Sequence, residues 1–216
     1  DAKVTKAAKS VFTLTTFKAD GSIIATTHGV YCGDNGDAIS AFQPFVGANS
    51  AAIIDASGKK YDVEAIYGAN SMYDICRFRV SSKSTSPLPM AQNLSADKAY
   101  AVGYSTKKAD IKALTLKSTE TFKDKYTYYI FNEEISEETE GCPIVNANGE
   151  LIGLVQRSST SYDIHSTDAR FYSELVSSGL SSQDPALQKT AIRTALPTDF
   201  HQAQLMLLMF DSNTDS

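Results

Sequence analysis

Three residues of this chain, His28, Asp74 and Glu140, have side chains and an order that suit acid–base chemistry. The first two are 46 residues apart and the last two are 66 residues apart. An imidazole exchanges protons near neutral pH, and a neighbouring carboxylate fixes which of its nitrogens carries the proton. Such a pair activates a hydroxyl or thiol nucleophile. His28 and Asp74 have the residue types of such a base and its orienting acid, whereas the carboxylate of Glu140 has no proton for a base to remove at neutral pH.

Short β-strands must position these residues. The first 180 residues alternate runs of β-branched and aromatic residues with turn dipeptides. Val11–Lys18 alternates in polarity and ends at Asp20-Gly21, a hairpin signal, and Ser22–Thr27 is the predicted returning strand. The other predicted strands are Ala38–Phe42, Ala51–Ala56, Lys60–Ile66, Ile75–Val80, Ala99–Tyr104, Ile111–Ser118, Tyr126–Phe131, Pro143–Val145, Leu151–Gln156 and Ala169–Val176.

A polar segment with two prolines, Ser81–Pro89, separates these strands into two sets of about six. Two such sets predict an all-β fold built as two β-barrels or as a sandwich. The predicted units are residues 1–86 and 87–180. Residues 181–216 change character and predict a C-terminal helical hairpin, because Asp184-Pro185 has the residue types of a helix start.

Composition excludes several classes of function. The chain has 216 residues, a net charge of −5 and ordinary apolar (42%) and charged (21%) fractions. The negative charge argues against a nucleic-acid partner held by phosphate contacts. No apolar run approaches the roughly 18 residues of a membrane span. Cys32, Cys76 and Cys142 lack metal-ligand spacing, so we expect small buried side chains, no metal and no cofactor.

Three segments, read together, resemble the catalytic motifs of one family. They are Ile23–Val30, which holds the histidine, Tyr73–Val80, which begins with the aspartate, and Glu138–Asn146. The chain is similar over about residues 10–176 to trypsin-like serine proteases, and most similar to their HtrA-like branch. The family's loop runs Gly-x-Ser-Gly-Gly-Pro, and aligning it on Gly141 and Pro143 places Glu140 at the serine.

The resemblance implies two six-stranded antiparallel barrels, with His28 as base, Asp74 as acid and Glu140 at the nucleophile position. It also implies that backbone N–H groups of Glu138 and Glu140 stand where an oxyanion hole is built. Glu138 replaces a glycine that the family favours, and Cys142 replaces the second glycine after the nucleophile. These departures predict a degenerate protease, a pseudoenzyme that binds a peptide or protein. Proteins of this group are usually exported, so we expect a periplasmic or extracellular location.

A live endopeptidase is the alternative. Its nucleophile would be Cys142, a sound partner for His28, or a serine such as Ser136 after a rearrangement of the loop. Using Cys142 shifts the loop by two residues and moves Pro143 out of place.

Two further features carry weaker predictions. Five glutamates between residues 133 and 140 make either a solvated acidic loop or a site for a cation or a basic peptide segment. His165 is expected to be an exposed histidine in a polar loop, Ser159–Asp168.

Overall fold

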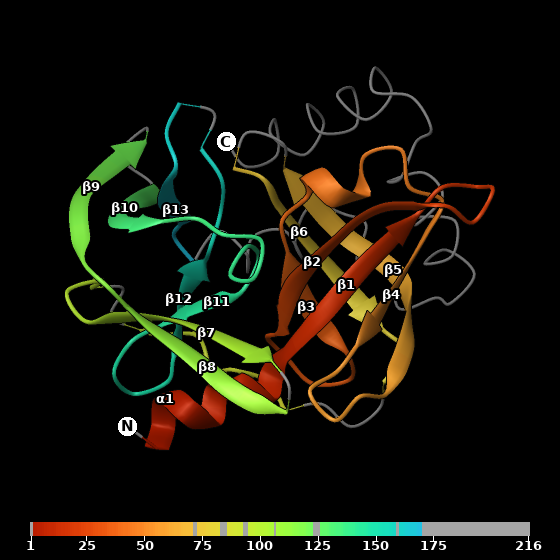
Figure 1. The fold of residues 1–216 in the computed structure, drawn as a ribbon, viewed down its shortest axis with the longest axis horizontal. Helices are drawn as coiled ribbons and strands as arrows, with labels where there is room; N and C mark the ends of the chain where they lie inside the picture. The colour runs from red at the N-terminus through yellow and green to blue at the C-terminus, as the bar shows by residue number, and fades with distance from the viewer. Residues whose placement is uncertain are drawn as a thin grey trace.

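The computed structural model describes residues 2–70, 73–82, 86–92, 95–105, 107–122, 126–158 and 160–169. Within them the chain is built almost entirely of antiparallel strands in two halves, with a short helix near the N-terminus (Figure 1). The predicted helical hairpin at 181–216 and most of the strand predicted at 169–176 lie outside the described residues. No helix of the described part is long and apolar enough to cross a membrane.

The first half is a closed six-stranded barrel with the strand order β1-β2-β3-β6-β5-β4. Its strands are β1 (Val11–Phe17), β2 (Ile23–Tyr31), β3 (Asp37–Ser40), β4 (Ser50–Ile54), β5 (Lys60–Asn70) and β6 (Ile75–Val80). Phe12, Phe45 and Phe78 fill its core, with ring centroids 5.4 to 6.0 Å apart in the two pairs they form. Burial of such rings is the main stabilising contribution of a small barrel.

Two details of this barrel differ from the sequence prediction. Strand β2 continues to Tyr31, so His28 lies inside the strand and not after its end. Strand β3 ends at Ser40, and a 3₁₀ helix, Gln43–Phe45, follows it. Pro44 explains this helix, because its fixed φ suits a first helical turn and it lacks the N–H that a strand would need.

The second half contains two sheets, ordered β12-β11-β7-β8 and β13-β10-β9. Its strands are β7 (Ala99–Ser105), β8 (Lys108–Leu114), β9 (Leu116–Phe122), β10 (Tyr126–Glu134), β11 (Pro143–Val145), β12 (Leu151–Leu154) and β13 (Asp163–Thr167). The single strand predicted at Ile111–Ser118 is in fact two strands, β8 and β9, because the chain turns at Thr115 from one sheet into the other. Strand β13 forms where a polar loop was expected.

The two halves share a core and are packed against each other. Val30, Ile39 and Ile75 of the barrel lie in one buried cluster with Val102 and Leu154 of the second half. Helix α1 (Ala2–Ala7) inserts its two buried residues into the same cluster, and Figure 1 shows it beneath β7 and β8. This shared core fixes where loops of one half meet strands of the other.

Candidate functional site

The loop between β10 and β11 is a tight turn whose backbone groups are paired. The Glu140 N–H donates to the Ser136 carbonyl at 2.9 Å, and the Gly141 N–H donates to the Val155 carbonyl at 2.9 Å. Gly141 has a φ of 85°, a conformation that side chains with a Cβ rarely adopt. The turn therefore uses up the N–H at position 140 and presents the carbonyl of Glu140 outward.

That carbonyl anchors the loop to strand β2. It accepts a hydrogen bond from Thr27 Oγ1 at 3.1 Å and lies 3.0 Å from Nδ1 of His28. A carbonyl only accepts, so Nδ1 carries the proton and the half-buried imidazole is held by the loop backbone. A Cβ at Gly141 would collide with the carbonyl oxygen of His28, which shows how closely the loop and β2 approach.

Asp74 lies in the turn before β6 and binds the start of the 3₁₀ helix. Its Oδ1 accepts the backbone N–H groups of Phe42 at 3.0 Å and Gln43 at 2.8 Å. Burial raises the pKa of Asp74 to about 6, the two N–H groups oppose that shift, and the charge of Glu140 adds to it. Within the described residues no hydrogen bond joins Asp74 to His28. One oxygen of the carboxylate, Oδ1, is held by the backbone of Phe42 and Gln43 instead.

The carboxylate of Glu140 faces Arg157 and not His28. Its Oε1 accepts from Arg157 Nε at 2.7 Å, in an ion pair that remains partly open to solvent. Glu140 thus meets His28 through its backbone carbonyl, and its carboxylate points to Arg157. Its charge nevertheless acts on Asp74, so Asp74 and Glu140 are neighbours across the two halves.

Gln156 is a structural partner of this cluster that the sequence prediction missed. Its side chain is buried, and Nε2 donates to the carbonyls of Tyr73 at 2.7 Å and Asp74 at 3.0 Å. Oε1 accepts the N–H of Thr167 at 2.7 Å. Gln156 therefore ties the Asp74 turn to the second half. The sequence feature that could have revealed this role is the amide side chain at the end of the apolar run Leu151–Gln156.

Both alternative nucleophiles, Cys142 and Ser136, contact other groups of the same loop. Cys142 is fully buried, its Sγ lies 3.6 Å from the Glu138 carbonyl, and burial raises the pKa of its thiol to about 12. Thiol nucleophiles react as thiolates, and burial disfavours that form of Cys142. Ser136 Oγ lies 2.9 Å from Thr139 Oγ1 within the turn. The three cysteines are free.

The remaining candidates are dispersed through the second half. His165 is buried in β13, where its Nδ1 lies 3.0 Å from Tyr128 Oη, and burial lowers its pKa. It is therefore not an exposed loop histidine. The Glu133 carboxylate accepts the N–H of Thr115 at the bend between the sheets. No cluster of metal-binding side chains is present in the described part of the chain.

Residues 15–154 match the family model described as a trypsin-like peptidase domain. The match spans more than half of the chain. The chain belongs to the trypsin-like peptidase family. No curated protein matches this trypsin-like peptidase domain in sequence.

Solved structures share the fold of this trypsin-like peptidase domain. The serine endoprotease from Yersinia pestis has a TM-score of 0.68 and 16% identity, over 82% of this chain and 66% of its own. The Rv3671c protease from M. tuberculosis, in its active form, has a TM-score of 0.66 and 12% identity, over 80% of this chain and 81% of its own. The HtrA-type protease AlgW, solved with a decapeptide, has a TM-score of 0.65 and 14% identity, over 82% of this chain and 66% of its own. This chain thus spans just under two thirds of the first and third proteins, and these identities establish the fold alone.

Proposed function

We propose that this trypsin-like peptidase domain is catalytically degenerate and binds a peptide or protein without cleaving it. The observation that carries the proposal is the pair of hydrogen bonds that Asp74 accepts from the backbone of Phe42 and Gln43. It determines which side chain the acid can orient.

A triad needs an imidazole held by the acid on one side and facing the nucleophile on the other. The exposed residue Gln43 lies next to the Asp74 carboxylate through its backbone N–H. A primary amide does not take up a proton near neutral pH. His28 does have an imidazole, but the Glu140 carbonyl sets its orientation. The acid therefore has no base to act through.

The nucleophile position supports the same conclusion. The family resemblance assigns it to Glu140, whose carboxylate has no proton to lose at neutral pH and is paired with Arg157. The Glu140 N–H, which an oxyanion hole would require, is donated to the Ser136 carbonyl. The lack of a base beside the acid, the carboxylate at the nucleophile position and the engaged oxyanion donor together support the proposal.

The binding role rests on the fold. AlgW, which shares the fold, was solved with a decapeptide. A domain that keeps a peptidase scaffold while losing its chemistry retains surfaces shaped for peptide segments. We also propose export from the cytoplasm, the location usual for HtrA-like proteins; fractionation of expressing cells tests it.

The experiment compares the wild-type chain with two variants, using a fluorophosphonate probe and fluorescently labelled unfolded casein. The wild type is expected to show neither labelling nor cleavage, and Cys142→Ala should not change that result. The double variant Gln43→His/Glu140→Ser is the matched test of a rebuilt site. Stoichiometric labelling of the wild type, or cleavage that Cys142→Ala abolishes, would favour the endopeptidase. Failure of the uncleaved wild type to bind casein peptides would remove the binding role.

A further inference from the structure

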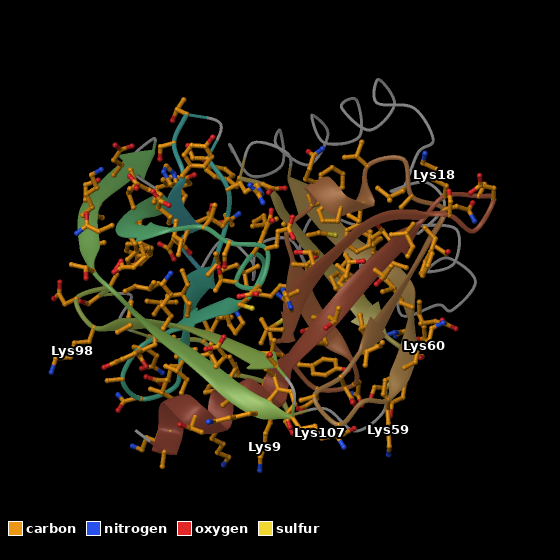
Figure 2. The ribbon with its side chains drawn as sticks, viewed as in Figure 1. Lys9, Lys18, Lys59, Lys60, Lys98 and Lys107 are labelled. Carbon is orange, nitrogen blue, oxygen red and sulfur yellow. The ribbon has the colours of Figure 1, made fainter. Side chains whose placement is uncertain are left out.

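A groove lined by lysines lies beside α1, and none of its lining residues belongs to the Asp74–Glu140 cluster. It consists of two cavities of about 280 and 470 Å³ that share Lys9 and Ser86. The larger one has the size of an ordinary ligand pocket. Figure 2 shows Lys9 and Lys59 along one edge of the molecule, with Lys98 and Lys18 far from them.

The groove is positively charged although the chain is acidic. Its lining contains four lysines and one carboxylate, in a chain with a net charge of −5. The carboxylate is Asp55, whose Oδ1 already accepts the N–H groups of Ser57 and Lys59 and the Ser57 hydroxyl. The lysines are Lys3, Lys6, Lys9 and Lys59. Concentrated positive charge of this kind attracts an anionic partner.

A buried hydroxyl on the wall of the larger cavity has no protein partner. Tyr31 is only 3% exposed, and its hydroxyl makes no hydrogen bond. Ser82 lies close enough to act on its pKa, yet not in the geometry of a hydrogen bond. Burial raises the pKa of Tyr31 to about 12, so the group keeps its proton. An unpartnered buried donor is costly, and a ligand oxygen in the groove would remove that cost.

We propose that this groove binds an acidic peptide segment of a partner protein. Carboxylates of the segment would lie against Lys9 and Lys59, and one oxygen would accept the Tyr31 hydroxyl. The two cavities adjoin at Lys9 and Ser86, and together they exceed what a single small anion fills. Tyr61 and Tyr104 add aromatic surface for the segment's apolar atoms.

The lining favours a peptide over a phosphate-rich partner. As far as the structure describes this groove, its cations are lysines without arginine, so it offers point charges and no planar fork. Lysine attracts carboxylates and phosphates alike, and the aromatic surface of Tyr61 and Tyr104 beside the lysines is what favours a peptide. The proposal concerns a different surface from the degenerate site and does not depend on it.

Fluorescence anisotropy with a labelled peptide of alternating Glu and Gly tests the proposal on the full chain. Lys9→Glu is expected to weaken binding by about tenfold, because it places a like charge in the groove. The matched control Lys98→Glu changes an exposed lysine elsewhere and should alter binding by less than about twofold. Equal losses in the two variants would overturn the proposal, since they would indicate general charge attraction.

A second variant separates binding from folding. Tyr31→Phe removes only a hydroxyl that has no partner, so the melting temperature should not fall while peptide binding weakens by about threefold or more. The proposal is overturned if Tyr31→Phe binds as the wild type does, or if the same peptide with Gln in place of Glu binds equally well. It is also overturned if polyphosphate, single-stranded DNA or phosphatidylglycerol vesicles bind more tightly than the acidic peptide.

Discussion

Glu140 is a structural residue in this molecule, and each of its polar groups has a protein partner. The N–H donates to Ser136, the carbonyl accepts from Thr27 and faces His28, and the carboxylate binds Arg157. A catalytic nucleophile must present a free, activated atom to its substrate. At the scale of single residues, the polar groups of Glu140 stabilise the loop instead.

The raised pKa of Asp74 predicts a pH dependence of stability. Folding raises this pKa from 3.8 to about 6, so the folded state holds the proton more tightly. The resulting stabilisation is complete below about pH 4 and is lost as pH rises through 6. The side chain of Asp74→Asn stays neutral at every pH. The free energy of unfolding of this variant should therefore rise relative to that of the wild type by up to about 3 kcal/mol between pH 4 and pH 8.

Urea unfolding at a series of pH values measures this difference. Asp34→Asn, at an exposed turn position, is the matched control. Its free energy of unfolding should differ from that of the wild type by the same amount at every pH. Glu140→Gln should reduce the pH dependence, because the charge of Glu140 contributes to the raised pKa of Asp74. A constant difference between Asp74→Asn and the wild type across this pH range would contradict the prediction.

At the scale of elements, the contact between the Ser136–Cys142 loop and β2 depends on a glycine. Gly141 combines a positive φ with a position where a Cβ would meet the His28 carbonyl. Backbone atoms cannot move aside as a flexible side chain can, so the loop can approach β2 this closely only without a Cβ.

Gly141→Ala and Gly21→Ala form a matched pair that isolates this contact. Both glycines have φ near 85°, but nothing lies within 4 Å of a Cβ at Gly21. Gly21→Ala should cost only the strain of the left-handed conformation, about 1 to 2 kcal/mol. Gly141→Ala should cost at least about 2 kcal/mol more, from steric overlap. Denaturant unfolding measures both, and equal losses would show that the loop relaxes away from β2.

At the scale of the whole molecule, a shared core and one buried amide hold the two halves together. Gln156 of the second half satisfies the carbonyls of Tyr73 and Asp74, which belong to the first half. Buried backbone groups of this kind are rarely left without partners in native proteins.

Gln156→Leu should destabilise the chain by about 2 to 4 kcal/mol, because it leaves the Asp74 carbonyl and the Thr167 N–H without their partner and the Tyr73 carbonyl with Thr167 Oγ1 alone. The exposed change Gln43→Leu is the control and should cost less than about 0.5 kcal/mol. Thermal and urea unfolding report both values. A cost for Gln156→Leu similar to that of the control would mean that Gln156 does not couple the halves.

The sequence by itself determined most of the strands, the order of the three motifs and the family, but it missed β13 and merged β8 with β9. Alternating polarity and turn dipeptides are local properties, so β1 and β6 could be predicted closely from composition and spacing. The alignment on Gly141 and Pro143 likewise places Glu140 at the nucleophile position without any structure, because the loop's turn residues lie next to it in the chain.

Only the tertiary structure decided which side chains meet. The strand extension that places His28 inside β2, and the 3₁₀ helix that brings the backbone of Gln43 to Asp74, depend on the register and closure of the barrel. The pairing of Gln156 with the Asp74 turn requires both halves to be packed together. Partner choice is a long-range property, since a residue's neighbours in space come from distant parts of the chain, whereas strand formation is local.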